Sequence, residues 1–130
     1  MSTTLTRIHS DTMRLPTYKL VRLLNKNLGT TLVAFLANVK SRQIPNRWAT
    51  DPSDPQHIEP RDEAKQRLQL AYQAFKAISE AEDNEHVARS WLIGANPRFD
   101  GDTPAQKIRE YAVKEIYTAV KDFIDDTGGA

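Results

Sequence analysis

The chain has 130 residues, of which 27% are charged, and it contains no cysteine, so we expect one compact domain or two small ones without disulfide bonds or cysteine-bound metals. No apolar run approaches the roughly 20 residues that span a bilayer, and the first residues lack the apolar stretch of a secretory signal. We therefore expect a cytoplasmic protein with no membrane contact. The net charge of +1 hides an asymmetry: residues 1–49 carry eight Lys or Arg and one Asp, which gives +7, whereas residues 50–130 carry ten Lys or Arg and sixteen Asp or Glu, which gives −6. The two parts are expected to have different roles, and the basic part could face a polyanion.

The N-terminal part predicts an arm followed by three short helices. Residues 1–15 are expected to form a flexible arm. Residues 16–50 show apolar stripes separated by polar or glycine-containing breaks, which predict three helices. These helices begin at Pro16, Leu32 and Arg42. Ser41 is expected to cap the third helix, "RQIPNRWA".

A proline-rich segment separates this group from the rest. Residues 51–60, "DPSDPQHIEP", contain three prolines and two aspartates and predict a linker. From Pro60 to about Glu82 the apolar residues are spaced by four and three positions, which predicts a long helix with a narrow packing seam. The seam consists of Ala64, Leu68, Ala71, Phe75 and Ile78. It could form a dimer contact, but an intramolecular core is the use we favour.

Two more helices are expected after the long one. Asp83 or Asn84 is expected to cap a shorter helix, which ends at Gly94 in a left-handed conformation. The four residues from Thr103 match a capping box with proline at the first helical position. They predict one last helix that continues through Ile124.

The sequence as a whole predicts an all-α fold. No segment shows a convincing strand pattern, and no internal repeat is present. The six expected helices form a helix-turn-helix-like group over residues 16–50 and a small helical group over residues 61–125. Residues 126–130 are expected to be disordered.

The third predicted helix separates into two faces. A helical wheel places Ile44 and Trp48 on a buried face. The opposite face holds side chains with forked donors that suit base edges, namely Arg42, Gln43, Asn46 and Arg47. A short helix after a tight turn, packed on an apolar helix, is the helix-turn-helix plan, and Lys40 and Lys26 would meet phosphates. The pattern predicts DNA binding, although any solvated surface helix separates its faces in this way and Pro45 would distort the first turn.

The sequence contains no recognisable catalytic or metal-binding motif. His9, His57 and His86 are far apart and lack the spacing of metal ligands, and Gly94 and Gly101 do not form a phosphate-binding loop. We therefore expect no enzymatic activity, no metal and no cofactor.

The stretch "WLIGANPRFDGDTP", residues 91–104, carries two large aromatic side chains in a segment that glycine and proline interrupt. In a structural interpretation, Trp91 and Phe99 fold back and plug the end of a small helical bundle. In a functional interpretation, a rigid loop with partly exposed aromatic side chains binds another protein. Both interpretations can hold at once.

This stretch resembles the toxin-binding domain of Xre/MbcA/ParS-type antitoxins. The resemblance rests on a W-L pair, an N-P step, a glycine turn and a T-P helix start, which are Trp91, Leu92, Asn96, Pro97, Gly101, Thr103 and Pro104. Residues 20–49 are similar to the Xre-like helix-turn-helix of the same family, and the two matches together cover about residues 17–124. The usual Leu-Gly-Gly is replaced here by Phe99, Asp100 and Gly101.

The resemblance implies a type II antitoxin that silences a cognate RES-domain toxin, an enzyme that degrades NAD, and that represses its own operon on palindromic operator DNA. It also implies a homodimer or a hetero-oligomer with the toxin. The implied toxin-binding residues are Trp91, Leu92, Asn96, Pro97, Arg98, Phe99, Gly101 and Pro104. The predicted DNA-binding residues are Lys40, Arg42, Gln43, Asn46 and Arg47. Two alternatives stay open: a solitary transcriptional regulator without a toxin, and a helical scaffold that binds neither DNA nor a toxin.

Overall fold

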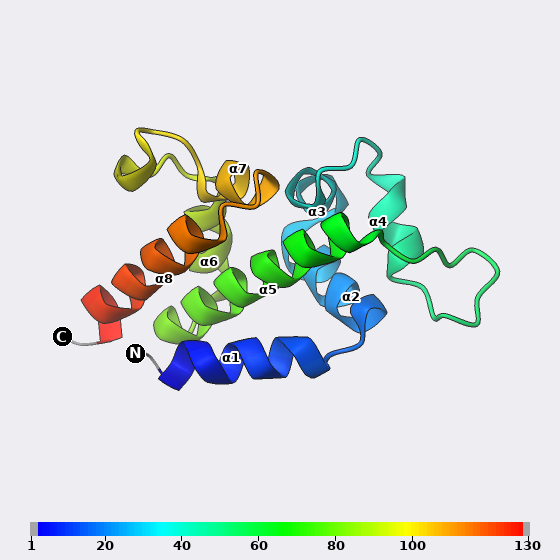
Figure 1. Cartoon of the computed structure of the whole chain (residues 1–130), viewed down its shortest axis with the longest axis horizontal. Coiled ribbons are helices and arrows are strands. Elements are labelled where there is room, and N and C mark those ends of the chain that lie inside the picture. Colours follow the sequence, from blue (N-terminus) through cyan, green and yellow to red (C-terminus); the bar gives the residue numbers. More distant parts are fainter. Residues whose placement is uncertain (1–2, 129–130) are drawn as a thin grey trace.

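The computed structural model describes residues 3–128, and all the regular secondary structure in this range is helical (Figure 1). No residue in this range lies in a β-strand, so the predicted all-α class is confirmed. Eight α-helices and one short 3₁₀ helix occur among these residues, where the sequence predicted six helices. In chain order they are α1 (Thr3–Arg14), α2 (Thr17–Leu28), α3 (Thr30–Ala37), α4 (Gln43–Trp48), α5 (Asp62–Glu82), α6 (Glu85–Ile93), η1 (Pro97–Phe99), α7 (Pro104–Arg109) and α8 (Val113–Gly128).

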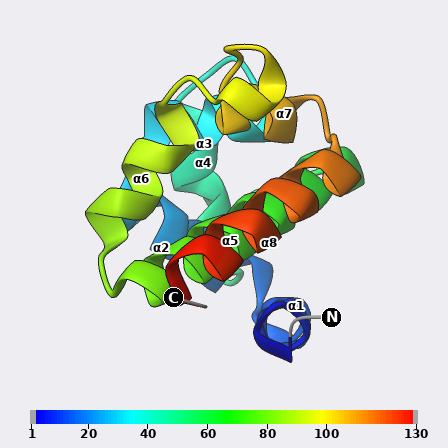
Figure 2. The same cartoon turned by 90° about the vertical axis from the view of Figure 1, so that its left-hand side faces the viewer.

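The long helix α5 is the axis around which the other helices pack. It crosses the centre of the molecule with α1, α2, α3, α6, α7 and α8 against it (Figures 1 and 2). The predicted seam is buried at every position from Ala64 to Ile78, and Leu70, Ala74 and Ala77 on other faces are buried as well. Because nearly every side of α5 is covered, the seam forms an intramolecular core.

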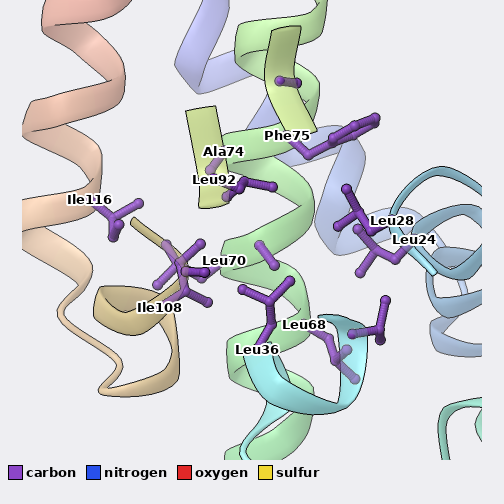
Figure 3. Close-up of a cluster of buried hydrophobic side chains, with 14 of the residues drawn as sticks. Leu24, Leu28, Leu36, Leu68, Leu70, Ala74, Phe75, Leu92, Ile108 and Ile116 are labelled. Atoms are coloured by element: carbon purple, nitrogen blue, oxygen red, sulfur yellow. The ribbon is translucent and has the colours of Figure 1, made fainter. Parts of the chain in front are cut away.

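One continuous apolar core joins the two predicted helical groups. Leu24 and Leu28 of α2 approach α5 from one side, and Ile108 of α7 and Ile116 of α8 approach it from the other (Figure 3). All four side chains are at most 3% exposed. The two groups are therefore two sides of one core and not separately packed units.

The N-terminal segment differs from the sequence prediction. Residues 3–14 form α1, which packs along α5, so the flexible arm predicted for residues 1–15 is wrong over this helix. Residues 1–2 lie outside the described part of the chain. Ile8 and Thr12 are 1% and 0% exposed, and the Thr12 hydroxyl donates to the Ile8 carbonyl oxygen at 2.6 Å. Residues 3–14 are ordered as α1 because this helix covers one apolar side of α5.

The predicted last helix is divided in two. α7 ends at Arg109 and α8 begins at Val113, because Tyr111 between them is left-handed with a φ of 58°. The Ala112 amide donates to the Lys107 carbonyl oxygen at 2.9 Å, a bond of the Schellman motif that closes many helices. The chain therefore changes direction where the sequence pattern predicted a continuous helix.

The C-terminal end is also more ordered than predicted. α8 continues to Gly128, so the disorder predicted for residues 126–130 is wrong for residues 126–128, while residues 129–130 lie outside the described part. Phe123 and Ile124 pack against the core near this end of the helix. The contacts of these apolar side chains with the core stabilise the last turns of α8.

Polar side chains begin α6 and α7 as predicted. The Asn84 side-chain oxygen accepts from the His86 amide at 2.8 Å, and the Thr103 hydroxyl accepts from the Gln106 amide at 3.0 Å. Gly94, by contrast, is extended with φ −85° and ψ 148°, so the left-handed conformation predicted for it is wrong. The two caps fix where α6 and α7 begin.

The cap at Thr103 predicts a measurable contribution to stability. Thr103→Val keeps the shape of the side chain but removes the acceptor, so it should lower the free energy of unfolding by about 1 kcal/mol. Thr103→Ser keeps the hydroxyl and should retain most of the stability. Urea denaturation of the three proteins measures the difference, and equal stabilities for the Val and Ser variants would contradict the role of this cap.

Candidate functional site

The turn between α3 and α4 is closed by specific hydrogen bonds. Asn38 ends α3 in the left-handed conformation, with a φ of 62°, which asparagine adopts more readily than most residues. The Val39 amide donates to the Ala34 carbonyl oxygen at 3.0 Å. The Ser41 hydroxyl accepts from the Gln43 amide at 3.1 Å. Arg42, and not the predicted Ser41, holds the N-cap position of α4, and its side chain makes no capping hydrogen bond. α4 begins at Gln43, one residue later than predicted.

The buried side of α4 is anchored on α2. Trp48 is 3% exposed and Ile44 is half-buried, and these are the two side chains predicted to face inward. Pro45 is buried too and is the third helical residue, where a backbone N–H would have no partner within the helix. The missing donor of this proline is therefore compatible with the helix. The Asn25 side-chain amide of α2 donates to the Pro45 carbonyl oxygen at 3.1 Å.

The outer side of α4 and the turn before it is basic and polar. The side chains predicted to meet DNA are all exposed, namely Lys40, Arg42, Gln43, Asn46 and Arg47. No cation of this set forms an ion pair with another residue in the range 3–128. Arg47 Nε donates to the Gln56 carbonyl oxygen at 2.8 Å. The predicted residues therefore share one accessible surface, and DNA binding itself stays a prediction.

The predicted linker is an ordered loop that packs beside α4. The side chain of His57 is only 8% exposed. Its Nδ1 lies 2.9 Å from the Thr50 carbonyl oxygen, and its Nε2 lies 2.5 Å from a carboxylate oxygen of Glu59. Only the protonated imidazole can donate to both acceptors. The bond to Glu59 raises the pKa of His57, against the opposing effect of partial burial.

The same loop carries negative charge close to the basic surface. The backbone amide and hydroxyl of Ser53 both donate to one carboxylate oxygen of Asp51, at 2.9 and 2.7 Å. These bonds lower the pKa of Asp51, and the nearby Arg22 of α2 lowers it further. The carboxylate therefore stays charged at neutral pH and limits how far the basic surface extends past the C-terminal end of α4.

The segment from residue 94 to residue 103 is cross-linked by its own hydrogen bonds. The Asn96 carbonyl oxygen accepts from the amides of Phe99 and Gly101 at 2.9 and 3.1 Å, and the Asn96 side chain accepts from the Arg98 amide at 2.9 Å. The Asn96 amide donates to the Asp102 carbonyl oxygen at 3.0 Å. One asparagine thus fixes the loop, and Gly101 at a φ of 89° completes the turn.

Several residues of the aromatic stretch belong to the core. Phe99 is 7% exposed, Leu92 is 0% exposed, and Pro104 is buried. Trp91 is half-buried and meets the Phe123 ring edge to face, with 6.5 Å between centroids and 67° between planes. The structural interpretation therefore explains these aromatic side chains.

The predicted partner-binding set must be corrected accordingly. Leu92, Phe99 and Pro104 offer no side-chain surface to a partner, because they are buried within this chain. The side chains that remain accessible belong to Pro97 and Arg98, beside the exposed backbone of Gly101, while Trp91 and Asn96 are half-buried. Arg98 also forms an ion pair with Asp122 of α8.

Sequence reasoning missed one cation that joins the two halves of the chain. Nη1 of Arg109 in α7 donates to the Phe35 carbonyl oxygen of α3 at 2.9 Å, and its guanidinium carbon lies 4.6 Å from the centroid of the Phe35 ring. Nε of Arg67 in α5 donates to the Arg109 carbonyl oxygen at 2.7 Å. No local sequence pattern points to this contact, because its partners are 74 and 42 positions away in the chain.

The described residues offer no metal site and no membrane span. Residues 3–128 contain no group of three or more His, Asp or Glu side chains placed to hold a metal ion. No helix in that range is long and apolar enough to cross a bilayer.

The pairing of His57 predicts a pH-dependent contribution to stability. Because its pKa is raised in the folded state, the contribution should be complete below the usual histidine pKa of about 6.5 and lost as the pH rises through the folded value. The difference in unfolding free energy between the wild type and His57→Gln should therefore shrink from about pH 5.5 to about pH 9. Urea denaturation across this pH range measures the difference in unfolding free energy. Glu59→Gln should make this difference depend less on pH. A difference that grows with pH would contradict the stabilising role of protonated His57.

No protein-family model matches this chain, and neither does any curated protein or solved structure. Its functional assignment therefore depends on its own residues and their arrangement.

Proposed function

We propose that this chain is a type II antitoxin that binds and neutralises a RES-domain, NAD-degrading toxin and represses its own operon by binding DNA. One geometric observation supports this proposal above the others. The basic surface around α4 and the cross-linked loop at residues 94–103 lie at opposite ends of the molecule (Figure 1). A toxin bound at one end would leave the other end free for operator DNA.

The DNA-binding part of the proposal is supported by charge and by exposure. Residues 1–49 carry eight Lys or Arg against one Asp, and such an excess attracts phosphates. Arg42, Gln43 and Asn46 of this part project forked donors into solvent, which is what reading of base edges requires. A homodimer of the chain would present two such helices to a palindromic operator.

The toxin-binding part of the proposal is supported by the loop. Its hydrogen bonds to Asn96 hold Pro97 and Arg98 in one conformation on the surface. A preorganised surface loses little conformational entropy when it binds. Neutralisation needs no catalytic group, because covering the entrance of the toxin active site is sufficient to deny it NAD.

The alternative function is a solitary helix-turn-helix regulator with no toxin. The burial of Leu92, Phe99 and Pro104 favours it, because core packing alone then explains much of the motif that resembles the antitoxin family. The two functions share the DNA-binding surface and differ only in the role of the loop. Presence of a RES-domain gene beside the gene for this chain would distinguish them.

The first test concerns DNA. Arg42→Ala combined with Arg47→Ala should weaken binding to the chain's own promoter by about 100-fold or more, since each lost specific contact costs about 1–3 kcal/mol. A gel-shift titration measures this loss, with the exposed pair Arg14→Ala and Arg61→Ala as the matched control. A double variant that keeps its helical circular dichroism and shifts DNA like the wild type would remove α4 from this role.

The second test concerns the toxin and leaves the core intact. Pro97→Asp combined with Arg98→Glu changes two exposed loop positions and should weaken the complex with the neighbouring RES-domain toxin by at least about tenfold. Co-purification and NAD consumption measure the loss of inhibition. Lys65→Glu with Gln66→Asp on the exposed side of α5 is the control pair. Full inhibition by the loop variant would show that the loop is not the contact.

A further inference from the structure

An apolar hollow lies between α3, α6 and α7, helices that stand together in Figure 2. It has a volume of about 420 Å³, and its lining includes Leu32, Phe35, Ile93 and Ala105, with Arg89 at its edge. Ile93 is 45% exposed. The hollow thus leaves apolar side chains uncovered.

A second hollow continues the first along α3 and adds positive charge. Its volume is about 400 Å³, and it shares Thr31 and Phe35 with the first hollow. Lys40, Arg42 and Arg109 line it. Among residues 3–128, no carboxylate lines either hollow, so the two together form an apolar groove with a basic rim, which we call the α3 groove.

The rim charges of the α3 groove are not neutralised by the chain itself. Within residues 3–128, Lys40, Arg42 and Arg89 take part in no ion pair. Elsewhere in the same range the cations Arg7 and Arg98 do pair with carboxylates across helices. Unpaired cations around an apolar floor attract carboxylates that arrive on another molecule.

We propose that the α3 groove is a docking site for an acidic, apolar segment of a partner protein. Apolar side chains of the segment occupy the two hollows, whose volumes lie in the range of about 300–1,000 Å³ that is typical of ligand pockets. Its carboxylates meet Arg89 at one end and Lys40 and Arg42 at the other. A nucleic acid fits the groove less well, because its phosphates would face the apolar side chains of Leu32, Phe35 and Ile93.

The floor of the groove is already fixed in the free protein. The Arg109 guanidinium lies over the Phe35 ring and donates a hydrogen bond to the Phe35 carbonyl oxygen. The neighbouring Leu36 and Leu28 are buried in the core. A preformed surface of this kind binds without a large ordering cost. The inference goes beyond the antitoxin proposal, since it requires neither a RES-domain toxin nor operator DNA.

Selection from a random peptide phage library on the full-length chain tests the proposal. Enriched peptides should combine at least two apolar residues with two or more Asp or Glu. Fluorescence anisotropy with one such labelled peptide should show affinity at least about tenfold lower for Ile93→Asp and for Arg89→Glu, and lower affinity at high salt. Leu23→Asp and Arg14→Glu, exposed positions outside the groove, serve as matched controls.

Three results of the peptide experiments would overturn the proposal. They are the absence of any enriched peptide, enrichment of peptides without acidic residues, and unchanged binding by the folded Ile93→Asp and Arg89→Glu variants. In a parallel gel shift with the chain's own promoter, these two variants should bind DNA like the wild type. If they lose DNA binding and keep peptide binding, the groove serves nucleic acid and the proposal is wrong.

Discussion

The need to cover the apolar faces of α5 governs the architecture of this chain. Leu68, Phe75 and Ile78 lie on the seam of this helix, Leu70 lies on another face, and all four are at most 5% exposed. A helix with apolar residues on more than one face is stable in water only when other elements cover those faces. Each covering helix contributes about 25 cal/mol for every Å² of apolar surface it removes from water. This requirement explains why the N-terminal residues form α1 against α5 instead of an arm.

The contacts of Arg109 show how this packing determines the positions of the basic surface around α4 and of the loop at residues 94–103. This residue connects α7, which follows the aromatic loop, with α3, which precedes the basic helix α4, and Arg67 fixes its backbone to α5. A guanidinium over an aromatic ring contributes about 0.5–1 kcal/mol at an exposed site and more where water is excluded. The orientation of α4 relative to the loop is therefore set by direct contacts and not by the length of the linker.

Sequence reasoning succeeded where short-range rules determine the structure. The seam from Ala64 to Ile78 follows helical spacing, and the caps at Asn84 and Thr103 depend on residues at most three positions away. α1 was missed although Leu5, Ile8, Thr12 and Leu15 also follow the helical period, because the polar residues between them favoured an arm.

Other features depend on distant parts of the chain, and local patterns do not contain them. The break at Tyr111 has no glycine to mark it, and the tyrosine ring is held 5.7 Å from the guanidinium of Arg67. Phe99 is 7% exposed, Nζ of Lys107 in α7 lies 5.9 Å from its ring centroid, and Phe99 lines a hollow together with Lys114 and Thr118 of α8. The sequence could therefore indicate an important aromatic stretch without deciding which of its side chains would stay on the surface.

The two proposed binding surfaces overlap at Lys40 and Arg42, which line the α3 groove and also belong to the predicted DNA-binding set. An acidic segment in the groove would neutralise these cations and place carboxylates where phosphates must approach. Binding at two sites is coupled whenever one ligand binds less well in the presence of the other, and the coupling is reciprocal. Loss of the phosphate contact of Lys40 alone would also reduce the salt dependence of DNA binding. A partner in the α3 groove would thus release the chain from DNA by direct competition for charge, with no change in the helical core.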